Sequence, residues 1–205
     1  MRMRPLLVFA ICALALFGMP SCKKKTPSPV ISNQPPTEGA DWYALDKQKL
    51  AKNPNDADTW NELAYQYDEA KVYDKAADAY LKVIKLAPKG YIYFKLGNDY
   101  NQLNQPEKAV DAFKMANKLM HGYALAYNNM GVAYGKMGKT DEEIASYKEA
   151  VRLRPSYPDP VLNLGVAYLK KGDRADALKQ YNTLKGLDEG QAQVLEKLLN
   201  AKGKL

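Results

Sequence analysis

Apolar residues recur along residues 57–191 with the spacing of paired amphipathic helices. The pairs Leu63-Ala64, Leu96-Gly97, Met130-Gly131 and Leu164-Gly165 begin 33, 34 and 34 residues apart, which indicates a tandem repeat. Within a repeat, positions 4, 7, 8 and 11 share one face of a helix, and positions 20, 24 and 27 share one face of a second helix. Each repeat is therefore predicted to fold as a helical hairpin.

Small residues at positions 8 and 20 predict that the two helices of a hairpin approach closely, because a bulky side chain would push their axes apart. Three residues are predicted to end first helices: Asn104, Gly138 and Gly172. Thr140 and Glu143 have the spacing of a capping box, which predicts that their side chains cap the second helix of the third repeat. The predicted repeats span residues 57–89, 90–123, 124–157 and 158–191.

The residue types at these positions resemble those of the tetratricopeptide repeat. The first repeat shows the order well, with Trp60 before the Leu-Ala pair and Tyr67, Ala76 and Tyr80 after it. The resemblance covers residues 57–190 and implies an all-α fold. That fold is an α-solenoid of four helical hairpins, stacked as a right-handed superhelix, with a C-terminal capping helix.

Both flanks of the repeats are also predicted to be helical. Apolar residues in the segment 41–56 predict an N-terminal helix that covers the first repeat, or else a degenerate half-repeat: Trp42, Leu45 and Leu50. Apolar residues on one helical face in the segment 192–205 predict a capping helix followed by a tail: Ala192, Leu195, Leu198 and Leu199. A cap is expected because the last hairpin of a stack otherwise exposes its apolar flank.

The resemblance implies a concave groove lined by the first helix of each repeat, where peptides dock. Phe94, Tyr65 and Tyr91 are the expected anchors, and Asn98 and Asn128 can both donate to and accept from the main chain of an extended partner. The predicted groove residues are Asn61, Tyr65, Tyr91, Phe94, Asn98, Asn101, Asn128, Val132, Lys136, Leu162, Val166 and Lys170.

Two alternatives to this surface remain open. The apolar residues Leu162, Val166 and Leu169 could be covered by the C-terminal helix instead of a partner. The amides of Asn61, Asn128 and Asn163 could bond to neighbouring backbone.

Residues 1–21 have the pattern of an export signal. A basic start precedes an apolar run that ends at Met19, and at about 14 residues this run is shorter than the roughly 20 that a membrane-spanning helix needs. With Cys22 after a small residue, the segment resembles a bacterial lipoprotein signal, which implies that the protein is anchored to a lipid membrane through an acylated Cys22. An ordinary secretory signal and an uncleaved anchor are the alternatives. The proline-rich residues 22–40 are predicted to form an extended tether.

Composition narrows the function. The mean hydropathy of −0.48 excludes a polytopic membrane protein. Five positive charges near the N-terminus account for most of the net charge of +7 and leave +2 for residues 26–205, so nucleic-acid binding is not expected. Both cysteines lie within the first 22 residues and His121 is the one histidine. The body therefore has no cysteine pair and no recognisable catalytic or metal-binding constellation, and we expect no enzyme activity, cofactor or metal.

The sequence favours a protein-interaction adaptor of the bacterial cell envelope that binds a partner peptide or helix in its groove. The alternative is a structural component that associates with itself as a homo-oligomer. By analogy with bacteria that sort lipoproteins by the residue after the cysteine, Lys23 favours the outer membrane, with the body facing the periplasm.

Overall fold

The computed structural model describes residues 43–201, which belong to one compact unit. The described residues form ten α-helices and no strand. The predicted signal, Cys22 and the tether lie outside the described residues, as does Trp42. The helices are α1 (Ala44–Lys52), α2 (Ala57–Glu69), α3 (Tyr73–Leu86), α4 (Gly90–Gln102), α5 (Pro106–Met120), α6 (Ala124–Lys136), α7 (Thr140–Leu153), α8 (Pro158–Lys171), α9 (Arg174–Leu184) and α10 (Glu189–Asn200).

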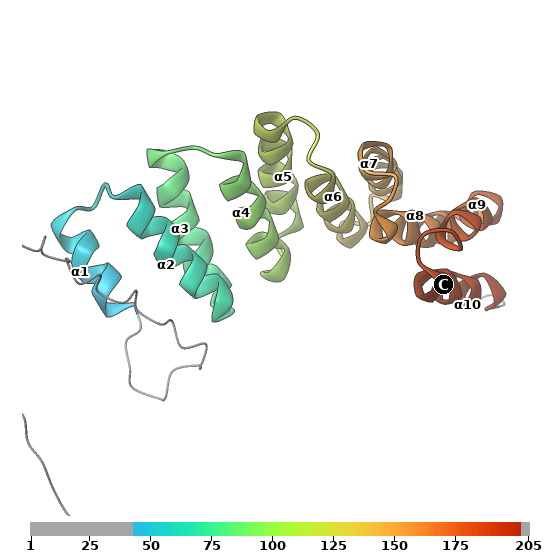
Figure 1. Ribbon diagram of the computed structural model, residues 1–205, viewed down its shortest axis with the longest axis horizontal. Coiled ribbons are helices and arrows are strands. Elements are labelled where there is room, and N and C mark those ends of the chain that lie inside the picture. Colours follow the sequence, from blue (N-terminus) through green and yellow to red (C-terminus); the bar gives the residue numbers. More distant parts are fainter. Residues whose placement is uncertain (1–42, 202–205) are drawn as a thin grey trace, which may run out of the picture. The chain divides into compact units, whose positions relative to one another are not determined.

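The four predicted hairpins are confirmed. Helices α2 and α3, α4 and α5, α6 and α7, and α8 and α9 pack in pairs, and each second helix also packs against the first helix of the next pair. Figure 1 shows these pairs following one another along the chain. The buried side chains form three clusters that run along this stack, so each hairpin completes its core with its neighbours.

Close approach within a hairpin depends on the glycine at position 8. A methyl group on Gly97 would lie 2.6 Å from the Phe113 ring, and one on Gly131 would lie 2.5 Å from the Tyr147 ring. The third hairpin also accommodates Glu143 at position 20, because Gly135 on the facing helix leaves room: a methyl group there would lie 2.8 Å from the Glu143 carboxylate. Glycine at position 135 thus compensates for a large residue where the other repeats have alanine.

The helix ends agree with the sequence in most places. Asn104, Gly138 and Gly172 have positive φ angles of 54°, 70° and 86°, as expected for residues that end a helix in the left-handed conformation. The predicted capping box is wrong. Helix α7 begins at Thr140 itself, its N-cap residue is Lys139, and no side chain caps it. Glu143 instead pairs with Lys170 of the next repeat at 3.3 Å.

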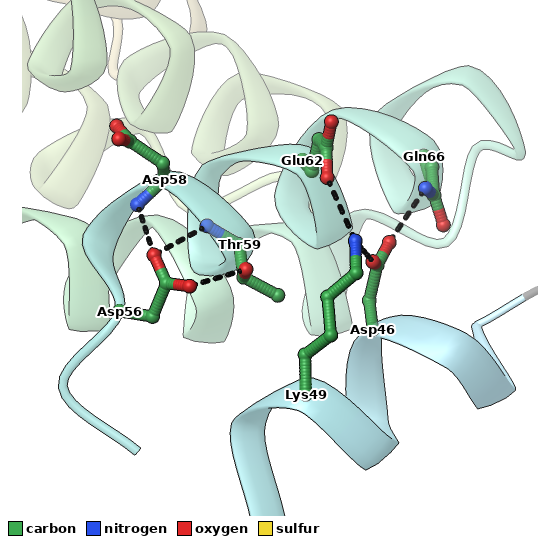
Figure 2. A network of polar contacts seen from close by, with 7 residues as sticks. All are labelled: Asp46, Lys49, Asp56, Asp58, Thr59, Glu62 and Gln66. Atoms are coloured by element: carbon green, nitrogen blue, oxygen red, sulfur yellow. Dashed lines mark hydrogen bonds and ion pairs between the residues drawn. The ribbon is translucent and has the colours of Figure 1, made fainter. Parts of the chain in front are cut away.

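The N-terminal helix α1 contacts the first repeat through both apolar and polar side chains. The buried carboxylate of Asp46 accepts hydrogen bonds from Lys49 Nζ and Gln66 Nε2, each at 2.8 Å, and Lys49 also reaches Glu62 (Figure 2). Leu50 is buried, but Leu45 is 64% exposed and so does not face the first repeat as predicted. The neighbouring Asp46, which the apolar pattern did not indicate, is buried against the first repeat instead of Leu45.

The next helix, α2, begins with a well-formed cap. Asp56 accepts hydrogen bonds from the backbone N–H groups of Asp58 and Thr59 and from the Thr59 hydroxyl (Figure 2). These bonds to Thr59 lower the pKa of the Asp56 carboxyl. The cap fixes where the first repeat begins.

The last helix, α10, is the predicted cap. Ala192, Leu195 and Leu199 are buried against α8 and α9, and Leu198 is half-buried. Leu195 lies against Gly165. In the second and third hairpins, the glycine at the same repeat position is covered by an aromatic side chain instead. Helix α10 therefore completes the fourth hairpin from outside.

Candidate functional site

All twelve predicted groove residues lie on the first helices α2, α4, α6 and α8, although they differ in accessibility. Tyr65 and Tyr91 are the most open of the aromatic residues, with 47% and 44% of their surface exposed. Asn128 is buried, and the others are half-buried or exposed. The two tyrosine rings are therefore accessible from solvent. The buried side chain of Asn128 instead hydrogen-bonds to neighbouring asparagines.

Four asparagines form a connected row across three first helices. Asn163 Nδ2 donates to Asn128 Oδ1 at 3.0 Å, Asn128 Nδ2 donates to Asn129 Oδ1 at 3.1 Å, and Asn129 Nδ2 donates to Asn98 Oδ1 at 2.7 Å. We call this row the amide ladder. It spans α8, α6 and α4, so it joins the fourth, third and second repeats. Asn128 and Asn163 therefore bond to other asparagine side chains. They do not make the bonds to neighbouring backbone that the alternative predicted.

An open hollow of about 360 Å³ lies beside the amide ladder. Four of its six lining residues are predicted groove residues. Asn101 Nδ2 donates to the backbone carbonyl of Asn129 at 3.3 Å, and Lys136 Nζ donates to the backbone carbonyl of Asn101. The Asn101 side-chain oxygen has no partner. The lining residues are Asn98, Asn101, Gln102, Asn129, Val132 and Lys136.

The predicted aromatic anchors have different surroundings. The ring of Phe94 packs edge-on against Tyr123 with centroids 5.0 Å apart and lies 6.0 Å from Phe113, so part of it belongs to the core. Tyr65 lies under Lys95, whose Nζ is 5.3 Å from the ring centroid. Tyr91 lies in the first turn of α4 and is 44% exposed. Tyr65 and Tyr91 are thus the freer contact points.

A buried group of charges lies where the first and second repeats meet. Lys95 Nζ pairs with Asp68 at 3.1 Å, and neither oxygen of the 1% exposed Asp99 has a hydrogen-bond donor. Burial, and next the charge of Asp68, raise the pKa of Asp99 to about 8. Burial alone would lower the pKa of Lys95, but the hydrogen bond and charge of Asp68 raise it on balance. Asp99 is therefore largely protonated at neutral pH.

At the far end of the surface, the predicted apolar and lysine positions are partly used by the fold. Leu162, Val166 and Leu169 are partly buried and pack against the apolar cluster of the last two repeats, to which Leu195 of α10 also belongs. Lys170 pairs with the buried Glu143. This end offers a partner less free charge than the sequence predicted.

Asn129 and Lys95 were missed as site residues because they occupy position 6, next to the expected position 5. The Asn128-Asn129 pair and the recurrence of asparagine at 129 and 163, 34 residues apart, were the available signals. Within residues 43–201, no group of three or more His, Cys, Asp or Glu could hold a metal ion. No helix in that range is both long and apolar enough to cross a bilayer.

Family models match two parts of the chain. A tetratricopeptide-repeat model matches residues 57–89, and a second TPR-repeat model matches residues 136–172. The chain contains tetratricopeptide repeats. The TPR fold is confirmed by the hairpin stack and by the solved structures that resemble it. No curated protein matches the sequence.

Several crystal structures share this TPR fold. MamA superposes with a TM-score of 0.69 at 26% identity, over 73% of this chain and 88% of its own. YrrB, described as a TPR protein with an unusual peptide-binding site, gives 0.68 at 22% identity, over 75% and 81%. PilW, a widely conserved type IV pilus biogenesis factor, gives 0.60 at 20% identity, over 78% and 83%. At such identities YrrB and PilW show the fold alone.

Proposed function

We propose that this protein is a binding scaffold that holds an extended segment of a partner protein along its first helices. The observation that carries the proposal is the hollow beside the amide ladder. The ladder uses Asn129 and Asn128 to position Asn98, whose Nδ2 has no partner in the described part of the chain. Amide groups held in this way can donate to and accept from the main chain of a bound peptide without reading its sequence.

Aromatic residues beside the ladder would add binding energy. Tyr65 and Tyr91 are exposed on the first two repeats, and aromatic side chains are enriched among the residues that dominate interfaces. YrrB, which shares the fold, is a protein with a peptide-binding site, and this supports the same use of the first helices here. Exposed aromatic rings and amide groups suit binding to another protein better than catalysis.

We further infer that the scaffold is tethered in the bacterial cell envelope, on the outer membrane with its body in the periplasm. The support is the sequence pattern that precedes Cys22 and the proline-rich residues after it. An acylated Cys22 and a tether would hold the binding surface near the bilayer. Replacing Cys22 by serine should release the protein from membranes, and membrane fractionation measures this directly.

Site-specific photocrosslinking in the producing cells tests the binding surface. A photoreactive residue at Gln102, which is exposed and lines the hollow, should give adducts with a discrete partner. The same probe at Leu119, exposed on a second helix, is the matched control. The double variant Tyr65→Ala/Tyr91→Ala should lower the adduct yield about tenfold, whereas Leu81→Ala/Leu119→Ala should not. Equal yields at the two probe positions would refute the surface.

Self-association is a second candidate that exposed apolar residues at the ends of the stack favour. Leu45 on α1, and Leu178 and Val194 on α9 and α10, have large exposed fractions. Exposed apolar groups of this kind can join copies end to end. Light scattering on the purified protein decides: a mass that stays monomeric at high concentration removes this candidate.

A further inference from the structure

Five exposed lysines gather in the C-terminal halves of α3 and α5 and in the turn after α3. None of their side chains makes an ion pair, a hydrogen bond or a ring contact within the described part of the chain. We call this group the basic edge. It consists of Lys82, Lys85, Lys89, Lys114 and Lys118.

Few acids lie near the basic edge in the sequence. Asp78 stands four residues before Lys82 and Asp111 three before Lys114, but neither makes an ion pair with these lysines, and no other Asp or Glu occurs before Asp99 or before Asp141 respectively. Asp58 starts α2 at the same end of the first hairpin but makes no ion pair with these lysines. Because residues 26–205 together carry only +2, the edge is a local excess of positive charge on a nearly neutral body.

Repetition places these lysines on one side of the stack. Lys85 and Lys118 share position 29 of the repeat, and Arg152 holds the same position in the third repeat. Consecutive hairpins point the same way, so the ends of their second helices align. Figure 1 shows the α3–α4 and α5–α6 connections along the same edge.

Some lysines elsewhere on the stack pair with acids: Lys171 lies 2.6 Å from Asp141, and Lys95, in the middle of α4, lies 3.1 Å from Asp68. Lys71 and Lys139, in turns within hairpins, make no ion pair within residues 43–201. Helix dipoles favour cations at helix C-termini by about 0.3–1 kcal/mol, which accounts for Lys85 and Lys118 in the last turns of α3 and α5. The dipole does not account for Lys89, Lys82 or Lys114, which lie outside those turns.

We propose that the basic edge docks on anionic lipid headgroups of the bilayer to which the tether holds the protein. The proposal rests on the anchoring inferred above. A tether of about 20 residues at about 3.1 Å each keeps the body within roughly 60 Å of the membrane, so a weak surface interaction acts at high effective concentration. Each lysine near an anionic surface adds to the attraction, and five on one edge fix which way the body faces.

Docking in this orientation leaves the amide ladder free, because the ladder lies on the first helices and the basic edge on the ends of the second helices. The groove would then open beside the bilayer, with both of its sides accessible to a partner. The basic edge thus sets the orientation of the scaffold on the bilayer and does not cover its groove.

Lysine labelling of the full, acylated chain reconstituted in lipid vesicles tests the proposal. Amine modification at each lysine is followed by mass spectrometry on vesicles with about 30% phosphatidylglycerol and on pure phosphatidylcholine. The basic edge should label about threefold more slowly on the anionic vesicles, and about 0.5 M salt should remove the difference. Lys71 and Lys139, exposed in turns within hairpins, serve as the internal reference.

Two variants of equal charge separate local docking from a general charge effect. The edge variant should lose the orientation, so that its remaining edge lysine labels equally on both vesicle types. The control variant, with four lysines replaced elsewhere, should keep the slow labelling of the basic edge. The edge variant is Lys82→Gln/Lys85→Gln/Lys114→Gln/Lys118→Gln, and the control, which keeps both reference lysines, is Lys75→Gln/Lys108→Gln/Lys148→Gln/Lys197→Gln.

The outcomes distinguish the edge from the anchor. A chain that floats with neutral vesicles but shows no slower labelling of the edge on anionic ones keeps the anchor and overturns the docking. A chain that floats only with anionic vesicles at low salt supports the edge and overturns the anchor. Protection of the edge by nucleic-acid fragments in detergent, with none on anionic vesicles, would overturn the lipid assignment in favour of a nucleic acid.

Discussion

Replacing Asp99 by asparagine should flatten the pH dependence of stability. The carboxyl group of Asp99 is 1% exposed, has no hydrogen-bond donor and faces the charge of Asp68. Asparagine has nearly the same shape, needs no proton to stay neutral and can donate from its amide to the Asp68 carboxylate. The variant therefore removes the titration and keeps the packing.

The magnitude follows from the raised pKa. The folded state holds a proton on Asp99 up to about pH 8, whereas the unfolded chain releases it near the ordinary value of 3.8. Between these values the folded state binds more protons, so stability is present at low pH and is lost as pH rises. The loss is about 1.4 kcal/mol per pH unit, or up to about 4 kcal/mol between pH 5 and pH 8.

Urea unfolding of residues 36–205, followed by far-UV circular dichroism at pH 5, 6, 7 and 8, measures this difference. As pH rises, the free energy of unfolding of the unsubstituted protein should fall relative to that of Asp99→Asn. Asp78→Asn, which changes an exposed carboxylate on α3, is the matched control and should run parallel to the parent. Parallel curves for Asp99→Asn as well would show that Asp99 is not held protonated by the fold.

Two further substitutions test the packing and the attachment of α1. Gly131→Ala would place a methyl group 2.5 Å from the Tyr147 ring, so urea unfolding should show a loss of about 1–3 kcal/mol. Gly186→Ala, with its nearest atom 3.7 Å away, should lose far less, and equal losses would contradict the packing argument. Asp46→Ala removes the acceptor for Gln66, so hydrogen exchange in α1 should quicken about tenfold, with α4 to α10 unchanged. Unchanged exchange in α1 would mean that apolar contacts hold it.

The sequence predicted the stack of helical hairpins well because repetition shows each feature several times. Gly97 and Gly131 fall at the same position of successive repeats, and the structure shows each of them against an aromatic ring. Where a feature occurs once, prediction failed. Glu143 matched a local capping pattern, yet its carboxylate pairs with Lys170, a contact 27 residues away that only packing of the next repeat creates.

The sequence predicted that the candidate surface residues lie on the first helices, but it did not predict which side chains hydrogen-bond to one another. Asn98 and Asn128 were expected to face a ligand, and the structure links them through Asn129 into one hydrogen-bonded row. Side-chain hydrogen bonds between repeats depend on how the helices are rotated and offset, which residue spacing does not specify. For the same reason, a pattern of apolar residues could not show that Asp46 of α1 is buried against α2.

The amide ladder also determines where the solenoid can bend. Hydrogen bonds among Asn163, Asn128, Asn129 and Asn98 link α8, α6 and α4, whereas the polar contacts between α2 and α4 both depend on Lys95, which pairs with Asp68 and lies over the Tyr65 ring. Spreading the last three repeats apart would break these part-buried hydrogen bonds. We therefore expect the second, third and fourth repeats to resist spreading more than the joint between the first and second repeats, where the first helices are linked through Lys95.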